Sequence, residues 1–335
     1  MTESAAPRLG PGEALRLAQI ARRFYLDGKS KQDIARELGV TRFKVARLLE
    51  DARDRGVVQI AIATPALIDP ELSERLAAAY RLRHAIVLAV PDCPEPELRG
   101  HLARVTADLL TEIVTDADVL GIGYGRTLNE TTAALTRLAR CTTVQLAGAL
   151  LGVHVSENSI ELVRRVAAVS SGPAYPLYTP QVLPDPGTAR TLRQEPQVAE
   201  VYRRFDDITK AVVAVGSWDP PHSLLYEALP ERERDELVAR GAAAEVCATL
   251  IGADGEDVAP EFTERCIAVR GDQLKAVDEV IAVAGGSDKL GAVAAVLRGG
   301  YANSLITDQL VARHLLDHIG VDDGPRDAPV ADRRS

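Results

Sequence analysis

Two glycine-containing loops carry the residues of this sequence that are best suited to hold an anion. The first reads GIGYGRTL and spans residues 121–128. Gly123 and Gly125 would leave backbone N–H groups bare. A helix beginning near Thr127 would point its positive dipole end at the same place, where the Arg126 and Thr127 side chains add donors. Arg126 occupies the last glycine position of the dinucleotide fingerprint, and the loop has no Walker lysine. The loop therefore favours a phosphate site over NAD or ATP, unless it is only a tight turn between a strand and a helix.

The second loop reads VAGGSDKLGAV, residues 283–293, and repeats this chemistry. Two glycines end an apolar run, and a helix starting near Ser287 would place Lys289 in its first turn. A cation there is unfavourable for the helix dipole, so that a bound anion would compensate it; a solvated lysine is the alternative. Glu245 opens a further apolar run, where it either accepts hydrogen bonds from ligand hydroxyls or is simply exposed. Two such loops on one sheet predict a small phosphorylated or otherwise anionic ligand.

Both loops follow apolar runs, and these runs define the elements that must position them. The runs that indicate strands are HAIVLAV (84–90), DVLGIG (118–123), TTVQLAG (142–148), AVVAVG (211–216), EVCATLIG (245–252), EVIAVAGG (279–286) and NSLITD (303–308). Most are followed by helical patterns, and apolar runs without polar alternation suit strands covered on both faces. We therefore predict an α/β domain with a mainly parallel sheet, in which ligands bind beyond the carboxyl ends of the strands.

A segment near the N-terminus, residues 30–55, predicts contact with a different partner. It reads SKQDIARELGVTRFKVARLLEDARDR, two short helices joined by a turn. Ser30 opens the first helix, Gly39 stops it, and Thr41 caps the second helix through its hydroxyl. The apolar residues of the second helix recur at helical spacing and form one face. On or near the opposite face lie Arg42, Phe43, Lys44 and Arg47. Such a helix fits the major groove of DNA, where its first turns meet base edges.

Charge separates this segment from an ordinary helical hairpin, which is the alternative interpretation. Residues 13–59 hold eleven Lys or Arg against seven Asp or Glu, a net charge of +4, whereas the whole chain is at −9 and the remainder therefore at −13. A basic module in an acidic protein is the electrostatic signature of nucleic-acid binding. After Gly56, the run VVQIAIA (57–63) suits a wing strand or a strand that joins two domains.

Length and composition limit the remaining classes of protein. The chain has 335 residues, of which 46% are hydrophobic, enough for about two or three domains with a substantial core. Its cysteines are scattered without the spacing of a metal or redox motif, and the pair His314 and His318 has no evident third ligand, so we expect no metal and no cofactor. The sequence has neither a signal peptide nor an apolar stretch of about 18 residues, which predicts a cytoplasmic protein without membrane contact.

Taken in order, these motifs resemble the SorC family of bacterial transcriptional regulators along nearly the whole chain. The matching segments are SKQDIARELGVTRFKVARLLEDARDRGVVQI, GIGYGRTL, VQLAG, PLYTP, VVAVGSW, AAAEVCATLIGADG, IAVAGGSDKLGAV and GGYANSLITD. The resemblance implies an N-terminal winged helix-turn-helix followed by a larger, mainly parallel α/β effector domain like that of sugar-phosphate isomerases. It also implies a homo-oligomer, usually a tetramer, that releases or remodels operator DNA when a sugar phosphate binds.

The resemblance also assigns residues to the effector site. The phosphate loop of the family corresponds to Gly123, Tyr124, Gly125, Arg126, Thr127 and Leu128, and its second anion contact corresponds to Lys289. Glu245 corresponds to the acid that contacts the sugar, although Ala244 stands where many relatives have Gly. Gly148 is a further expected effector contact, and the loop after it, residues 151–158, shapes the sugar end of the site in the family. The resemblance suggests His154 and Asn158 as its polar contacts.

We therefore expect a DNA-binding transcriptional regulator, not an enzyme, controlled by a small phosphorylated sugar. The expected organisation is a disordered tail at 1–12, a helix-turn-helix domain at 13–64, an effector and oligomerisation domain at 65–320, and a second disordered tail at 321–335. The expected DNA contacts are Ser30, Gln32, Thr41, Arg42, Lys44 and Arg47. The alternative is a sugar-phosphate isomerase or lactonase with a basic N-terminal segment. Isomerisation needs a paired general base and acid, and Glu245 and Asp219 are isolated candidates.

Overall fold

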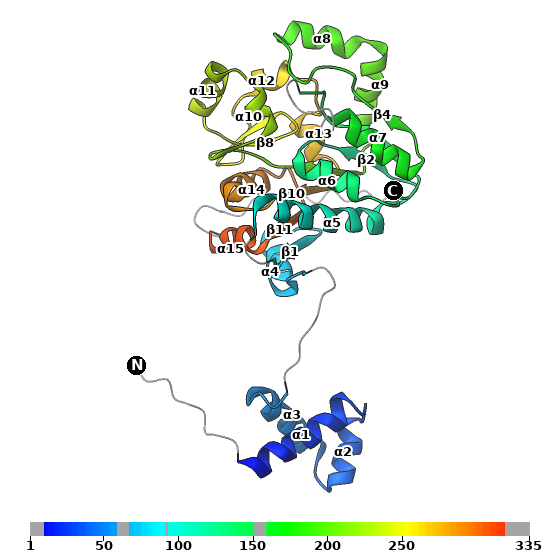
Figure 1. Cartoon of the computed structure of the whole chain (residues 1–335), viewed down its shortest axis with the longest axis vertical. Coiled ribbons are helices and arrows are strands. Elements are labelled where there is room, and N and C mark those ends of the chain that lie inside the picture. Colours follow the sequence, from blue (N-terminus) through cyan, green and yellow to red (C-terminus); the bar gives the residue numbers. More distant parts are fainter. Residues whose placement is uncertain (1–9, 59–66, 91–92, 151–158, 319–335) are drawn as a thin grey trace, which may run out of the picture. The chain divides into compact units, whose positions relative to one another are not determined.

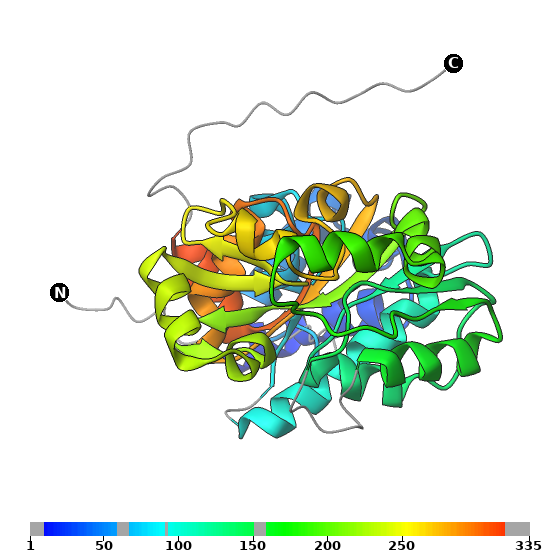
Figure 2. The same ribbon diagram turned by 90° about the horizontal axis from the view of Figure 1, so that it is seen from above.

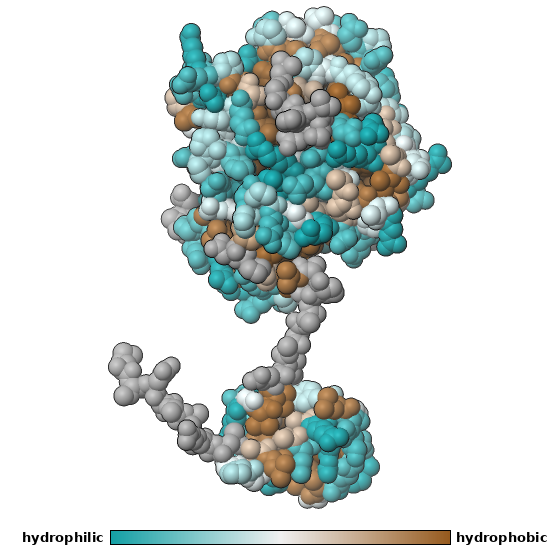
Figure 3. All heavy atoms as spheres, in the orientation of Figure 1, coloured by the Kyte–Doolittle hydropathy of each residue, from teal (hydrophilic) through white to brown (hydrophobic). Residues whose placement is uncertain are grey.

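The computed structural model describes residues 10–58, 67–90, 93–150 and 159–318. The chain divides into two units, Met1–Ala63 and Thr64–Ser335 (Figure 1). Each unit encloses its own core of buried apolar side chains. On the face seen in Figure 3, hydrophilic residues surround smaller hydrophobic patches in both units.

Three helices make up the described part of the N-terminal unit. They are α1 (Pro11–Tyr25), α2 (Lys31–Leu38) and α3 (Arg42–Asp54). Apolar side chains from all three, among them Leu17, Ile34 and Leu49, form one core. Because each helix has an apolar stripe and an opposite polar face, this core leaves the polar side of α3 at the surface.

Both ends of α2 and the start of α3 have the chemistry predicted for them. The N–H of Asp33 donates to Ser30 Oγ at 3.2 Å, and the N–H of Lys44 donates to Thr41 Oγ1 at 3.2 Å. Gly39 ends α2 in the left-handed conformation, with φ 64°. These caps satisfy backbone groups that helix ends leave unpaired, and the predicted helix-turn-helix is confirmed. The predicted wing strand falls mostly at 59–63, which lies outside the described residues.

In the second unit, the described strands form a seven-stranded sheet in the order β1-β11-β10-β5-β2-β3-β4, and every pairing in it is parallel. The strands are β1 (Ala85–Leu88), β2 (Val119–Ile122), β3 (Thr142–Gln145), β4 (Ala174–Tyr175), β5 (Lys210–Ala214), β10 (Glu279–Val283) and β11 (Ser304–Asp308). The predicted mainly parallel α/β architecture is confirmed.

Helices cover both faces of this sheet (Figure 2), which explains why its strands are apolar throughout. One layer contains α5 (Glu95–Ile113), α6 (Arg126–Ala134) and α7 (Ser159–Ser170), and the other contains α4 (Pro70–Tyr80), α9 (Pro196–Phe205), α14 (Leu290–Arg298) and α15 (Gln309–Asp317). Successive residues of β10 alternate between the two layers. Ile281 and Val283 join the core under α5, whereas Val280 and Ala282 join the core under α14.

The run at 245–252 departs from the prediction of one strand in the parallel sheet. It forms most of a hairpin in a separate four-stranded antiparallel sheet with the order β7-β6-β8-β9. The strands of this second sheet are β6 (Gly216–Trp218), β7 (Pro221–His222), β8 (Ala242–Val246) and β9 (Thr249–Gly252). The hairpin reverses at Cys247 and Ala248, whose φ angles of 49° and 71° are those of a two-residue turn. The sequence hides this turn because neither residue is Gly, Asn or Asp.

Short helices complete the second unit. They are α8 (Pro186–Gln194), α10 (Leu224–Ala228), α11 (Glu231–Ala239), α12 (Pro260–Glu264), α13 (Gly271–Lys275) and the 3₁₀ helix η2 (Ser287–Lys289). Trp218 of β6 is buried in a third core with Leu225 of α10, Leu237 of α11 and Phe262 of α12. The antiparallel sheet therefore has a small core of its own beside the larger parallel sheet.

Candidate functional site

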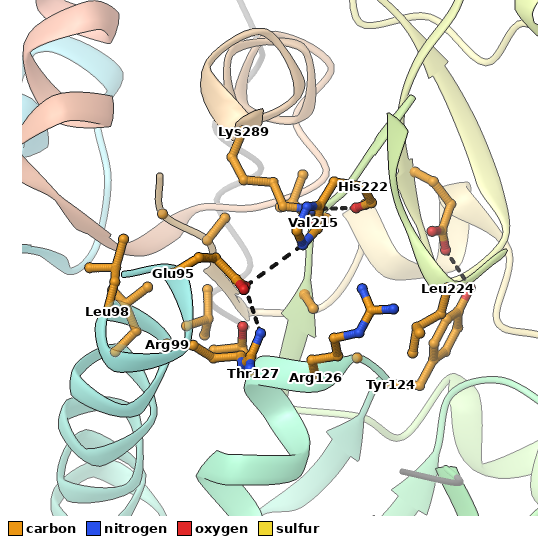
Figure 4. Close-up of a pocket in the computed structure, with 18 residues that line it drawn as sticks. Glu95, Leu98, Arg99, Tyr124, Arg126, Thr127, Val215, His222, Leu224 and Lys289 are labelled. Carbon is orange, nitrogen blue, oxygen red and sulfur yellow. Dashed lines mark hydrogen bonds and ion pairs between the residues drawn. The ribbon is translucent and has the colours of Figure 1, made fainter. Parts of the chain in front are cut away.

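A pocket opens where the carboxyl ends of β2, β5 and β10 meet the first turns of α5 and α6 (Figure 4). This is the edge of a parallel sheet at which ligands are expected to bind. The predicted site residues that line it are Tyr124, Gly125, Arg126, Thr127, Glu245 and Lys289. Residues from both predicted anion loops and from the second sheet are thus brought together.

The first turn of α6 presents backbone donors at the wall of this pocket. Gly125 is the N-cap of α6, and no side chain caps the helix there. A Cβ at Gly125, whose φ is +141°, would lie 2.7 Å from the Cβ of Ala214, so that only glycine fits. The N–H groups that follow have no partner within the helix, and the helix dipole adds to their attraction for an anion.

Two arginines flank the start of α6, and both already contact carboxylates. Arg126 Nη2 lies 2.8 Å and 2.6 Å from the two carboxylate oxygens of Glu227. Arg99 of α5 contacts Glu95 Oε1 through Nη1 at 2.6 Å and Glu130 Oε1 through Nε at 2.5 Å. Burial by itself would lower the pKa of Arg99, but the hydrogen bond to Glu130 and the charge of Glu95 raise it. The pocket therefore contains permanent positive charge.

Lys289 reaches the pocket from the opposite side. It is the last residue of η2 and the N-cap of α14, one step before the helical turn predicted for it. Its Nζ donates hydrogen bonds to the carbonyl oxygens of Val215 at 2.8 Å and His222 at 2.6 Å. Burial lowers the pKa of Lys289 to about 8, although the charge of Glu245 opposes this shift. An ammonium group has three N–H donors, so that one remains for a ligand.

The backbone around Lys289 supplies fewer donors than the sequence suggests. The N–H of Gly286 donates to Asp308 Oδ2 at 2.5 Å, and Asp308 Oδ1 accepts from Val311 N–H at 2.9 Å as the cap of α15. The second loop therefore contributes mainly the charge of Lys289 to the pocket.

Glu245 is buried in β8, with 4% of its surface exposed, and is not at an exposed strand start. Its carboxylate accepts hydrogen bonds from the Ser223 hydroxyl at 2.8 Å, from the Ala248 N–H at 3.2 Å and from the Tyr124 hydroxyl. Burial, together with the charge of Glu245, raises the pKa of Tyr124 well above its usual value. These donors fix the orientation of the carboxylate at the pocket wall.

Two further residues complete the surroundings of this carboxylate. Gln181 Nε2 donates to the Tyr124 oxygen at 2.8 Å. Gly216, opposite Glu245 in the antiparallel sheet, makes room for it, because a Cβ at Gly216 would overlap Glu245 Oε2. A glycine and a connected set of polar side chains thus allow a carboxylate to be buried at this position.

Three other predicted effector residues that the structure describes, Gly123, Leu128 and Gly148, do not line the pocket. The N–H of Gly123 donates across to β5 at 2.9 Å, and the Leu128 side chain is fully buried in the core under α5. A Cβ at Gly148 would lie 2.8 Å from the neighbouring backbone, which indicates close packing there. His154 and Asn158 lie outside the described residues.

Sequence reasoning missed Glu95, Arg99 and His222, all of which line the pocket. Glu95 and Arg99 look like an ordinary pair one helical turn apart on a surface helix, and only the packing of α5 beside α6 brings them to the site. His222 follows the short β6–β7 turn and has no sequence signal. Burial lowers the pKa of His222, and the charge of Lys289 lowers it further.

The predicted DNA-contacting face lies on the exposed side of α2 and α3. Gln32, Arg42, Lys44 and Arg47 are exposed, and α3 has no acidic residue in its first turn. Phe43, between two of these cations, has 86% of its surface exposed. The hydroxyls of Ser30 and Thr41 are used in the helix caps. This face therefore combines cations with one apolar ring.

Asp219, weighed above as a catalytic partner of Glu245, is exposed in the turn between β6 and β7 and does not line the pocket. Within the described residues, no group of three or more His, Cys, Asp or Glu side chains is arranged to hold a metal ion. The described helices include none that is long and apolar enough to cross a membrane.

The chain has a helix-turn-helix unit followed by an α/β unit with a cation-lined pocket. This architecture is typical of transcriptional regulators that respond to a ligand. Residues 65–317 match the family described as "Putative sugar-binding domain". Together with the relatives below, this match shows that the chain belongs to the SorC family of sugar-binding transcriptional regulators.

Curated relatives resemble the chain over most of its length. The deoxyribonucleoside regulator of Bacillus subtilis (strain 168) is 28% identical over 304 residues, 90% of this chain and 97% of the relative. The transcriptional regulator LsrR of Escherichia coli (strain K12) is 27% identical over 320 residues, 94% of this chain and 99% of the relative. Both relatives are named as regulators, and LsrR as a transcriptional regulator, in agreement with the expectation that the chain is not an enzyme.

Solved structures share the fold. The full-length sorbitol operon regulator SorC from Klebsiella pneumoniae aligns with a TM-score of 0.69 at 23% identity, over 91% of this chain and 99% of that chain. A domain of a possible sugar-binding transcriptional regulator from Arthrobacter aurescens TC1 aligns with a TM-score of 0.68 over 76% of this chain.

Proposed function

We propose that a small phosphorylated sugar, bound in the pocket at the start of α6, controls the binding of this regulator to operator DNA. The observation that carries the proposal is the pairing of two kinds of group in one pocket. The first turn of α6, Arg99, Arg126 and Lys289 attract an anion, and the buried Glu245 carboxylate accepts hydrogen bonds. A phosphate ester of a polyol offers both complements.

The two ends of the ligand follow from this arrangement. The phosphate would bind the N–H groups of α6 and the Thr127 hydroxyl, with Lys289 providing charge. Hydroxyl groups would reach toward Glu245, whose orientation is held by Tyr124 and Ser223. Deoxyribonucleoside and sorbitol operon regulators are among the similar proteins, which supports a sugar-derived effector.

In the N-terminal unit, Arg42, Lys44 and Arg47 would contact DNA in the major groove. Ser30, Gln32 and Thr41, near the helix starts, would contact phosphates or bases. We further propose that the regulator acts in the cytoplasm as a homotetramer. Paired DNA-binding units would then require operator half-sites about one helical turn, or a multiple of it, apart. The effector would change DNA affinity by its differential affinity for two arrangements of the subunits.

A thermal-shift screen with matched phosphorylated and free sugars tests the proposal. A ligand at 100 times its dissociation constant should stabilise the protein by about 2.7 kcal/mol. We expect the phosphorylated member of one pair to bind far more tightly than the free sugar. Equal affinity for both members of every pair would contradict a phosphate site.

A substitution at Thr127 then locates the site. Thr127→Val removes a hydroxyl with little change of volume, and should reduce the affinity for the phosphorylated sugar by about 1.5–3 kcal/mol in calorimetry. Thr191→Val is the matched control, because Thr191 is exposed on α8 and does not line the pocket. Operator binding without effector should survive both changes. Unchanged affinity in Thr127→Val would mean that the effector binds elsewhere.

A further inference from the structure

The carboxylate of Glu95 lies in the pocket beside Arg99 and His222. Its Oε1 is 2.6 Å from Nη1 of Arg99, one turn further along α5, and 3.7 Å from Nε2 of His222 (Figure 4). The contact with His222 joins α5 to the β6–β7 hairpin. Glu95 is the first residue of α5 and lines both this pocket and the neighbouring cavity beside Asp308. A carboxylate therefore already occupies part of the space that an anionic ligand needs.

The cations around Glu95 have other partners within the described chain. Arg126 is paired with Glu227, Arg99 also contacts Glu130, and the Lys289 ammonium donates to two carbonyl oxygens. A ligand with a single negative charge would take the place of the Glu95 carboxylate, which carries the same charge. The electrostatic attraction to the cations would therefore increase little. A ligand with two negative charges would gain additional attraction from the same cations.

Glu95 is also able to leave this position. Its side chain is 48% exposed, and as the first residue of α5 it can turn toward solvent while it stays beside the positive end of the helix dipole. Arg99, in contrast, is held by Glu130 and has only 17% of its side chain exposed. When the carboxylate moves out, the guanidinium therefore remains in place for the ligand.

We propose that the Glu95 carboxylate competes with the effector for the anion position of the pocket. In the free protein Glu95 occupies this position, and it thereby restricts the site to ligands that carry a dianionic group. The inference rests on the proposed function, since it concerns the same pocket. It distinguishes phosphate monoesters, which are close to doubly charged at pH 7, from sugar acids, which carry one charge. Removal of the Glu95 charge should therefore tighten anion binding and relax this selection.

The test compares Glu95→Gln with Glu97→Gln in the full-length chain. Glutamine keeps the shape of the side chain and removes the charge. Glu97 lies in the same first turn of α5, but its side chain is 62% exposed and does not line the pocket. Calorimetric titration at pH 7.5 with inorganic phosphate and with acetate measures binding of a largely dianionic and a monoanionic probe, and thermal melting checks that each variant is folded.

We expect Glu95→Gln to bind phosphate about three- to tenfold more tightly than the wild type, and to bind acetate that the wild type does not bind. Glu97→Gln should behave like the wild type. Phosphate affinity in Glu95→Gln equal to that of Glu97→Gln, or weaker, would overturn the inference while leaving the anion site intact. If neither the wild type nor Glu95→Gln binds phosphate, the proposed phosphate site itself fails, and the competitor role with it.

Discussion

The hydroxyl of Tyr124 donates a hydrogen bond to the carboxylate of Glu245, 121 positions away in the sequence. Tyr124 belongs to the loop that begins α6, and Glu245 belongs to the antiparallel sheet. Their exposed fractions are 8% and 4%, so that the bond is made away from water, where an unpaired carboxylate oxygen is costly. This contact connects the predicted phosphate loop to Glu245, the residue proposed to accept hydrogen bonds from the sugar hydroxyls.

Replacement of Tyr124 with Phe should destabilise the second unit by about 1–3 kcal/mol, because Glu245 loses a donor and Gln181 an acceptor in a buried place. Denaturant unfolding followed by the fluorescence of Trp218, the one tryptophan of the chain, reports on the adjacent core. Tyr178→Phe is the control, because Tyr178 is 70% exposed. Equal stability of the two variants would show that the Tyr124 hydroxyl contributes nothing.

Anion binding should depend on pH through Lys289. The pKa of Lys289 in the free protein is about 8, and its charged form is the one that attracts an anion. Affinity should therefore be high below pH 8 and fall as the pH rises through that value, while a phosphate monoester loses its second charge below about pH 6. Calorimetry between pH 6 and 9 checks this profile.

The Lys289→Ala variant should lose about 1.5–3 kcal/mol of phosphate affinity at pH 7 and show no decline above pH 8. Lys275→Ala, which removes an exposed lysine outside the pocket, should keep the wild-type profile. A decline above pH 8 that persists in Lys289→Ala would assign it to another group.

Replacement of Arg47 with Ala should weaken operator binding and leave the fold intact, because the side chain is exposed on α3. An arginine that contacts a base is worth about 1–3 kcal/mol of discrimination, whereas one that contacts only phosphate weakens all sequences alike and lowers the salt slope by about one. Gel-shift titrations at several salt concentrations separate the two cases. Arg16→Ala, an exposed cation on α1, controls for the loss of charge. Unchanged affinity in single alanine variants of Arg42, Lys44 and Arg47 would rule out this face.

A fragment that starts at Ala66 should fold alone, form the same oligomer as the full chain and lose DNA binding. The reason is that its sheet and cores are contained within the second unit. Size-exclusion chromatography with light scattering measures its assembly. A monomeric or aggregated fragment would place the oligomer contacts in the N-terminal unit or at the boundary.

The sequence was most informative where local chemistry determines the structure. Ser30, Gly39 and Thr41 cap or end their helices through contacts within a few residues, and these could be read directly. The apolar strands β2, β5 and β10 could also be recognised, because burial on both faces leaves no polar alternation.

The rest depends on contacts between distant segments, which one sequence does not reveal. The hairpin at Cys247 and Ala248 has no turn residues because the surrounding core imposes the left-handed conformation. The ion pair of Glu95 and Arg99 becomes part of a site only when α5 packs beside α6 and the β6–β7 hairpin approaches it. Whether a charged residue near a strand is exposed or buried, as for Glu245, is decided by partners from other elements.

The absence of a side chain at Gly216 has an evolutionary consequence. Any Cβ there would overlap the carboxylate of Glu245, so that a mutation of Gly216 alone would displace the acid from the pocket wall. A shorter acid at position 245 would relieve the overlap, but its carboxylate would stand farther from the hydroxyls of Tyr124 and Ser223. Positions 216 and 245 should therefore change together when related regulators diverge, and the residue pair found there would indicate which effector shapes a descendant can accept.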